Sequence, residues 1–323
     1  MASDLREALS SRILLTDGSY GVLLQQKGLT EADFRGERFK DHLKDVKNNP
    51  DLLNLTMPEL VAETHQAYID AGADIIETNT FTATSVSQED YGLEDYADEM
   101  SLEGARILRR VVDAAIAKDG KPRWAAGSIG PLNRSASVVV DADRPAYRNI
   151  DWDGLVETYY NQLKALLEGG VDLFLFETTF DTLNLKAGLF ATRKLFEETG
   201  KEIPVIASCF VDLAGGNLSG QDVEALWHSL RHFPLAAFGL NCSLGPKEMR
   251  PFIQRLSEIC DVPIIAYPNA GLPDPLSPTG FPESPESMGD HLGEWAASGL
   301  LNIVGGCCGN TPNHIRNIGA AVK

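Results

Sequence analysis

Cysteines in two distant parts of the sequence could act together on one metal ion. Cys242 lies in the segment GLNCSLGP, whereas Cys307 and Cys308 are adjacent in GGCCG near the end of the chain. Zinc binds cysteine thiolates; its structural sites have four protein ligands, and its catalytic sites have three and leave one position open. Because these are three cysteines without a CxxC pair, the pattern favours a catalytic zinc site.

Adjacent cysteines can face one metal only if the backbone turns sharply between them. Glycines on both sides of the pair, Gly305, Gly306 and Gly309, permit such a turn. Two alternatives remain for the pair, a vicinal disulfide that acts as a redox switch and buried, inert thiols. The other cysteines, Cys209 and Cys260, are expected to pack in the core and to be inert.

A metal held by three thiolates would activate a further sulfur ligand. A free thiol has a pKa of about 8.5 and is mostly protonated at neutral pH, whereas a coordinated thiol is deprotonated. Three thiolates more than neutralise the dication, so an additional thiolate stays electron-rich and nucleophilic. The site therefore suits attack on a methyl group better than activation of water, and it predicts methylation of a thiol.

Short apolar runs recur along the chain, and most are followed by an amphipathic stretch. Near-continuous hydrophobicity is typical of parallel strands that are buried on both faces. The predicted strands are Ile13–Thr16, Asp74–Thr78, Trp124–Ser128, Asp172–Glu177, Val205–Phe210, Ala237–Asn241, Ile264–Tyr267 and Asn302–Gly305. The predicted helices are Pro58–Gly72, Leu102–Lys118, Trp152–Gly169, Thr182–Gly200, Asp222–Arg231, Lys247–Cys260 and Pro285–Ser298.

This alternation predicts an α/β protein, a (β/α)8 TIM barrel that forms a single domain over residues 1–323. A doubly wound sheet is the alternative. Two connections, residues 28–55 and 272–286, are long and follow predicted strands. We expect both at the catalytic face, where they would shape the site or dock a partner; for the first, a tolerated insertion is the alternative.

Polar residues follow most of the predicted strands, at the end where a barrel builds its active site. Candidates for substrate contact are Asp17, Gly18, Thr78, Glu177 and Asn241. Carboxylates can bind an ammonium group, and N–H and hydroxyl groups can bind a carboxylate. This edge could therefore hold an amino acid by its head group while zinc holds its sulfur.

Other polar residues have less specific positions. Glu77, Asn79 and Asn269 also follow strands, and support of their neighbours is an equal alternative to substrate contact. The histidines of the predicted helices are expected to be surface or packing residues rather than ligands: His65, His228 and His314.

Charge and hydropathy limit which kinds of partner the protein can bind and where in the cell we expect it. The formal net charge of −18 argues against nucleic acid and against anionic membrane surfaces. No apolar run approaches the roughly 20 residues of a membrane span, and the first residues lack the apolar stretch of a signal peptide. We therefore expect a cytoplasmic protein, in which five cysteines are not a disulfide framework.

The motifs resemble those of the homocysteine S-methyltransferase family, most closely the homocysteine-binding N-terminal module of cobalamin-dependent methionine synthase. The resemblance covers nearly the whole chain and includes EADFRGERF, DLLNLTMPE, AGADIIETNTF, GPLNR, ETTFDTLN, LSGQ, FGLNCSLGP, PNAGLP and NIVGGCCG. It implies a TIM barrel in which homocysteine completes a three-cysteine zinc site. The matching residues are Cys242, Cys307 and Cys308 for zinc and Asp17, Gly18, Thr78 and Glu177 for the amino-acid head group.

Several methyl donors are compatible with the sequence. The sequence has no candidate corrinoid-binding loop, so we expect the homocysteine-activating subunit of a split methionine synthase, with methylcobalamin carried by a separate corrinoid-binding protein. A stand-alone enzyme that uses betaine, S-methylmethionine or S-adenosylmethionine is one alternative. Animal betaine enzymes of the family carry an aromatic residue after the phenylalanine that matches Phe81. This chain has Thr82 there, which cannot supply the aromatic wall that a quaternary ammonium group favours. A non-catalytic subunit that binds zinc and homocysteine is the other alternative.

Overall fold

The computed structural model describes residues 4–277 and 280–323 and contains one sheet of eight parallel strands. The strands are β1 (Leu14–Leu15), β2 (Ile75–Glu77), β3 (Trp124–Ile129), β4 (Leu173–Thr179), β5 (Val205–Cys209), β6 (Ala237–Asn241), β7 (Ile264–Tyr267) and β8 (Ile303–Val304). Each strand pairs with its sequence neighbour, β8 pairs with β1, and a bridge between Thr16 and Ile75 links β1 to β2. The predicted barrel is therefore confirmed, and every strand overlaps its predicted run.

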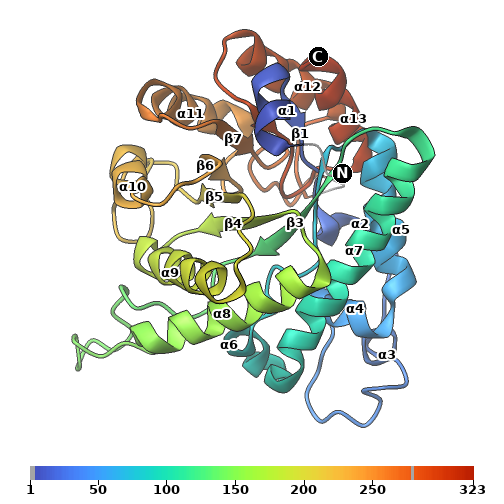
Figure 1. Cartoon of the computed structure of the whole chain (residues 1–323), viewed down its shortest axis with the longest axis vertical. Helices are drawn as coiled ribbons and strands as arrows, with labels where there is room; N and C mark the ends of the chain where they lie inside the picture. Colours follow the sequence, from blue (N-terminus) through green and yellow to red (C-terminus); the bar gives the residue numbers. More distant parts are fainter. Residues whose placement is uncertain (1–3, 278–279) are drawn as a thin grey trace.

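Helices surround the strands in chain order (Figure 1). They are α1 (Leu5–Ser11), α2 (Tyr20–Gln26), α3 (Glu31–Arg35), α4 (Leu53–Thr56), α5 (Pro58–Ala71), α6 (Ser85–Gln88), α7 (Ala97–Asp119), α8 (Trp152–Gly169), α9 (Thr182–Thr199), α10 (Val223–Leu230), α11 (Pro246–Ile259), α12 (Pro285–Ala297) and α13 (Pro312–Ala321). Three short 3-10 helices are η1 (Pro50–Leu52), η2 (Glu89–Tyr91) and η3 (Glu94–Tyr96). No helix in the described ranges has the length and apolarity needed to cross a membrane.

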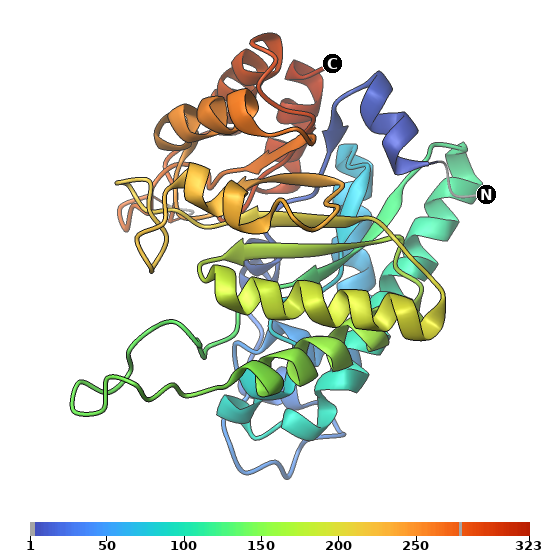
Figure 2. The ribbon, with the colours of Figure 1, turned by 60° about the vertical axis from the view of Figure 1, so that its left-hand side comes forward.

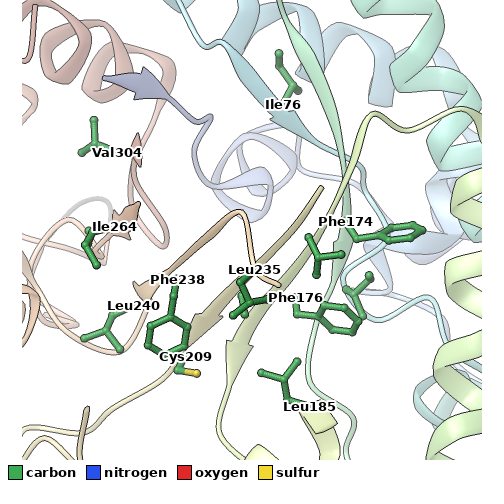
Figure 3. Packing of buried hydrophobic residues seen from close by; sticks show 14 of the residues in the cluster. Ile76, Phe174, Phe176, Leu185, Cys209, Leu235, Phe238, Leu240, Ile264 and Val304 are labelled. Atoms are coloured by element: carbon green, nitrogen blue, oxygen red, sulfur yellow. The ribbon is translucent and has the colours of Figure 1, made fainter. Parts of the chain in front are cut away.

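Strand β4 shows why the strands are apolar on both faces. Phe174 and Phe176 belong to the cluster between the sheet and the helices (Figure 3), whereas Leu173 and Leu175 belong to the cluster inside the barrel. Successive side chains of a strand point to opposite faces, so both faces of this strand are buried. Cys209 lies in the outer cluster and is buried, as expected for an inert thiol.

The amino ends of the strands are closed by helix α1, which the sequence analysis did not predict. Leu5 and Leu9 of this helix pack with Leu14, Leu173 and other aliphatic residues of the barrel interior. Asp4 accepts a hydrogen bond from the N–H of Arg6 and thereby caps the helix. The interior is thus sealed at this end.

The connection from β1 to α5 is more ordered than the sequence suggested. Its polar composition predicted a charged loop over residues 28–55, but it contains α3, η1 and α4. Phe34, Leu52 and Leu53 from this segment form a separate small core with Met100 of α7. The few apolar residues of the segment are thus the ones that fold it against the barrel.

Other boundaries also differ from the prediction. Helix α7 begins at Ala97 instead of Leu102, because Ala97, Met100 and Ser101 are buried and extend its apolar face. The connection between β3 and α8, residues 130–151, is long and extends away from the barrel (Figure 2), and it was not predicted as such. Of the predicted 272–286 connection, residues 278 and 279 lie outside the described residues.

Candidate active site

The cysteines of the predicted metal site meet at the carboxyl ends of β6 and β8. The sulfur atoms of Cys242, Cys307 and Cys308 all lie within 4.8 Å of one another, and all three thiols are free. The Sγ atoms of Cys242 and Cys308 are 3.8 Å apart. Sulfur ligands about 2.3 Å from a tetrahedral zinc ion are separated by about 3.8 Å, so the donor type and the spacing both fit zinc.

Cys242 reaches this position because the backbone leaves the strand abruptly. Cys242 and Ser243 have φ angles of 61° and 54°, in the left-handed region that non-glycine residues avoid. The N–H of Cys242 donates to the carbonyl of Tyr267, and the hydroxyl of Ser243 donates to the carbonyl of Val211 at 2.6 Å. Such residues cost about 1 to 3 kcal/mol each, and these hydrogen bonds stabilise the turn.

The predicted turn at Cys307 and Cys308 is present and depends on glycine. A Cβ atom on Gly305 would lie 1.9 Å from the hydroxyl oxygen of Thr16, and Gly309 has a φ of 81°. The N–H of Cys307 donates to the carbonyl of Pro268, and the N–H of Cys308 donates to the side chain of Asn269 at 3.1 Å. Asn269 therefore supports a cysteine, which was one of its two predicted roles.

The thiols influence one another strongly. Hydrogen bonds from Cys307 and Cys308 lower the pKa of Cys242 to about 3. The bond to Cys242 in turn raises the pKa of Cys308 to about 12 and that of Cys307 well above its ordinary value. In the absence of a cation the cluster favours one thiolate, because a second negative charge would be repelled. A dication is what would allow all three sulfur atoms to ionise together.

Two buried carboxyl groups, those of Asp17 and Glu177, and the partly buried carboxyl group of Glu77 form a second cluster at the same end of the barrel. Asp17, Glu77 and Glu177 follow or end β1, β2 and β4, and electrostatic repulsion couples them. Burial raises the pKa of Glu177 to about 7 and raises the pKa values of Asp17 and Glu77 well above their usual range. Within the described ranges, no lysine or arginine forms an ion pair with any of them. This concentration of acidic groups would be stabilised by a substrate ammonium group.

Hydrogen bonds orient the two predicted carboxylates. Asp17 accepts from the N–H of Glu77 at 2.9 Å. Glu177 accepts from the hydroxyl of Ser128, and the hydroxyl of Tyr267 lies 3.5 Å from its other oxygen. Ser128 and Tyr267 were not singled out from the sequence, although each is a polar residue inside an otherwise apolar strand. That interruption was the available signal.

Gly18 and Thr78 occupy different environments. A Cβ atom on Gly18 would lie 2.7 Å from the carbonyl oxygen of Asn310, so this position admits only glycine. Among the described contacts, the N–H of Gly18 has no hydrogen-bond acceptor in the protein. The hydroxyl of Thr78, in contrast, accepts from the N–H of Ser128 and shares a hydrogen bond with Thr80. Their predicted contacts with substrate remain predictions.

His65 is a buried packing residue, one of the two environments expected for it, and it lies close to the carboxylates. Its Nδ1 shares a short hydrogen bond with the hydroxyl of Tyr20, which also lies 3.0 Å from the carbonyl oxygen of Glu77 and 3.4 Å from Asp17. Burial lowers the pKa of His65 to about 3, so the ring is neutral. Tyr20 follows Asp17 by three residues, a spacing that could have suggested the contact.

The remaining candidates are placed as follows. Asn79 donates to the carbonyl of Pro50 and to Asn54, so its side chain supports the β1–α5 connection. Asn241 is fully buried between β4, β5 and Cys307. His314 caps α13, and its Nε2 contacts the carbonyl of Glu283. Among the described residues, the only group of three or more possible metal ligands is the cysteine cluster.

Comparison with known proteins gives one family and one recurrent fold. The sequence profile described as homocysteine S-methyltransferase matches residues 14–322. The metallated form of the homocysteine methyltransferase MmuM from Escherichia coli is 24% identical with a TM-score of 0.75, over 98% of this chain and 99% of that chain. Its oxidised form is 23% identical with a TM-score of 0.75, over 98% of each chain. At this identity the two structures demonstrate the shared fold.

Proposed function

The chain belongs to the homocysteine S-methyltransferase family, and from that membership we propose that it transfers a methyl group to the thiol of homocysteine to give methionine, with Zn²⁺ held by Cys242, Cys307 and Cys308. The observation that carries this proposal is the meeting of three free sulfur atoms, within 4.8 Å of one another, beside a cluster of carboxyl groups that have no lysine or arginine partner among the described residues. When bound, zinc would supply the charge that keeps the substrate thiol ionised.

The chain's own residues would then bind and orient the amino acid. Asp17 and Glu177 are buried and would accept hydrogen bonds from the ammonium group, whose charge offsets their mutual repulsion. The N–H of Gly18 would donate to the substrate carboxylate. Thr78 would contribute to binding the head group beside Gly18, and Asn241 would contribute at the sulfur end of the site. Together they would fix the sulfur at the metal and leave its free side open to the methyl donor.

We further propose that the donor is methylcobalamin on a separate corrinoid-binding protein. Exposed apolar side chains lie on the connections that follow β2, β3, β5 and β7 and in the first turn of α9, at the end of the barrel where the cysteines lie. They are Phe81, Val139, Val140, Tyr147, Leu183, Leu213, Leu218 and Leu276. Exposed apolar surface of this kind favours contact with another macromolecule. Thr82 donates its hydroxyl to buried Asp51 and supplies no aromatic wall for the quaternary ammonium of betaine.

The donor is tested by supplying each methyl source separately. Purified protein with zinc and homocysteine is incubated with a methylcobalamin-loaded corrinoid protein, free methylcobalamin, betaine, S-methylmethionine or S-adenosylmethionine, and methionine is measured. Turnover with the corrinoid protein alone supports the split-synthase role. Turnover with a small donor shows a stand-alone enzyme, and homocysteine binding without turnover from any source shows a non-catalytic subunit.

The substrate is tested with an analogue that lacks one group. 4-Mercaptobutanoate retains the thiol and carboxylate of homocysteine but not its ammonium group. If Asp17 and Glu177 bind the ammonium, the analogue should bind much more weakly than homocysteine to the zinc-loaded protein. Equal affinity for the two thiols would contradict the proposed head-group site.

A further inference from the structure

The side chain of Asn241 connects both parts of the site. It is fully buried, and its oxygen accepts hydrogen bonds from the N–H of Thr178 at 2.8 Å and from the hydroxyl of Ser208 at 2.7 Å. Its nitrogen donates to the hydroxyl of Thr178 at 2.8 Å and points to the sulfur of Cys307 at 4.0 Å. One amide thus bridges the end of β4, the strand β5 and the turn after β8.

The orientation of this amide is fixed by its partners. A backbone N–H can only donate, so the oxygen of Asn241 must face Thr178 and the nitrogen must face Cys307. Two acceptor sites and two donor hydrogens are then all directed at protein groups. No hydrogen-bonding capacity of the side chain remains for a substrate, so its contribution to substrate binding would be indirect.

Thr178 needs such support. It has a φ of 54°, although its branched side chain disfavours the left-handed region. It lies in the irregular part of β4, where the register with β5 shifts between Phe176 and Thr179. Because Thr178 directly follows Glu177, this irregularity sets the direction in which the carboxylate enters the site. Asn241 holds both the N–H and the hydroxyl of Thr178.

Cys307 receives the remaining hydrogen of the amide. A separation of 4.0 Å between nitrogen and sulfur is the outer limit of a hydrogen bond to a thiol, and an ionised sulfur attracts an N–H donor more strongly than a neutral one. An amide donor on a metal-bound thiolate orients that ligand and withdraws part of its charge. The geometry therefore suits Cys307 as a ligand thiolate better than as a free thiol.

We propose that Asn241 is a positioning residue that couples the two clusters: it holds the Thr178 irregularity that directs Glu177, and its N–H orients the sulfur of Cys307 as a metal ligand. This inference rests on the proposed function, because it requires the cysteines to bind a metal. It explains how a residue with no free hydrogen-bonding group would affect both the binding of the head group and the metal.

The two roles are separated by Asn241→Asp. The new carboxylate keeps an acceptor for Thr178 and Ser208, and the hydroxyl of Thr178 can rotate to donate to its other oxygen. Both N–H donors of the amide are lost, but only the one that faces Cys307 has no substitute, because an ionised carboxylate oxygen there would repel a thiolate. We expect some loss of stability, because the new carboxyl group is fully buried, together with an affinity of the folded variant for Co²⁺ reduced about tenfold or more and a shifted thiolate-to-cobalt absorption band.

The matched control is Asn184→Asp. Asn184 is also buried and accepts from the N–H of Ala136 while donating to the carbonyl of Arg134, but it lies in α9 and contacts none of the cysteines. Its Co²⁺ affinity and spectrum should be unchanged. If Asn241→Asp binds Co²⁺ with the same affinity and spectrum as the unaltered protein, the inference is overturned. Failure of the unaltered protein to bind zinc or cobalt would instead overturn the proposed function.

The proposed effect of Asn241 on Glu177 is tested with Asn241→Ala in cobalt-loaded protein. If Asn241 acts through Glu177, the affinity for methionine, which carries the same head group, should fall in Asn241→Ala. In Asn241→Ala combined with Glu177→Gln it should fall no further than in Glu177→Gln alone. Fully additive losses would show that Asn241 does not act through Glu177.

Discussion

The two ends of the barrel interior differ in both chemistry and backbone. At the amino ends of the strands, aliphatic side chains such as Leu173 and Ile206 fill the interior, and Leu5 and Leu9 close it. At the carboxyl ends, the same interior contains carboxyl, hydroxyl, amide and thiol groups. One end is stabilised by packing, and the other depends largely on hydrogen bonds between side chains and backbone groups of different strands.

Backbone strain follows the same division. Of the four non-glycine residues with positive φ in the part of the chain that the structure describes, Thr178, Cys242 and Ser243 lie at the carboxyl end of the barrel. Acidic groups without a lysine or arginine partner are at this end too, among the described residues. The comparison indicates that packing at the apolar end stabilises the fold and offsets the destabilising effect of backbone strain and charge repulsion at the other end.

Removal of one metal ligand at the carboxyl end should have the largest effect. Cys307→Ser or Cys242→Ala is expected to lose zinc and all methyl transfer, because three ligands are the minimum for a site with an open position. Metal content and methionine formation measure the two losses. Cys260→Ser, which alters a thiol outside the cluster, is the control and should retain both. Full zinc content with normal turnover in either ligand variant would refute the proposed site.

A cavity at the amino end should separate stability from function. Leu173→Ala removes a fully buried side chain of the interior cluster and should lower the free energy of unfolding by about 2 to 5 kcal/mol. Denaturant titration measures this loss. Zinc content per folded molecule should be unchanged, because the cysteines lie at the opposite end. A strong loss of zinc from folded Leu173→Ala would show that the two ends are not independent.

Neutralising one carboxylate should weaken substrate binding without affecting the metal. Glu177→Gln is expected to reduce homocysteine affinity by about 10- to 100-fold, since a hydrogen bond to a charged group contributes about 1.5 to 3 kcal/mol. Zinc should remain bound in equal amount. Calorimetry with homocysteine and metal analysis of the same sample provide the measurements. An unchanged affinity would argue against the head-group role.

The smallest expected effect concerns the pH dependence of stability. Burial holds the pKa of His65 at about 3, below its unfolded value of about 6.5. The unfolded chain therefore binds a proton that the folded protein does not, and this group destabilises the fold as pH falls from about 6.5 toward 3. His65→Gln keeps a partner for Tyr20 and does not titrate. The free energy of unfolding of the variant should fall less steeply over this range, and identical slopes would contradict the assignment.

The fold was predictable because burial on both faces leaves a strong pattern. In β4, Leu173 points into the barrel and Phe174 points toward the helices, and both are buried. The apolar run is therefore continuous in the sequence. The segment before α5 was less predictable, because Phe34 and the short Leu52–Leu53 pair interrupt a mostly polar stretch without a clear period. Only their long-range contact with Met100 shows that they form a core.

The cysteines of the site were predictable from the sequence, but the hydrogen bonds that link the site residues to one another were not. Cys242, Cys307 and Cys308 could be grouped because strand ends of a barrel share one edge and because thiolates suit zinc. Tyr20, His65 and Ser128 were not recognised as neighbours of the carboxylates, since their contacts join different elements. Asn241 was recognised as part of the site, but its partners on β4, β5 and the β8 turn were not.

The sequence by itself determined the barrel, the family and which cysteines come together, since apolar periodicity and residue chemistry are local properties of the chain. The tertiary structure decided how the sulfur atoms approach to 3.8 Å, which carboxylates repel one another and which amide joins the two clusters. These features depend on backbone angles at Thr178 and Cys242 that are unfavourable in isolation. Only contacts made across the completed barrel stabilise them.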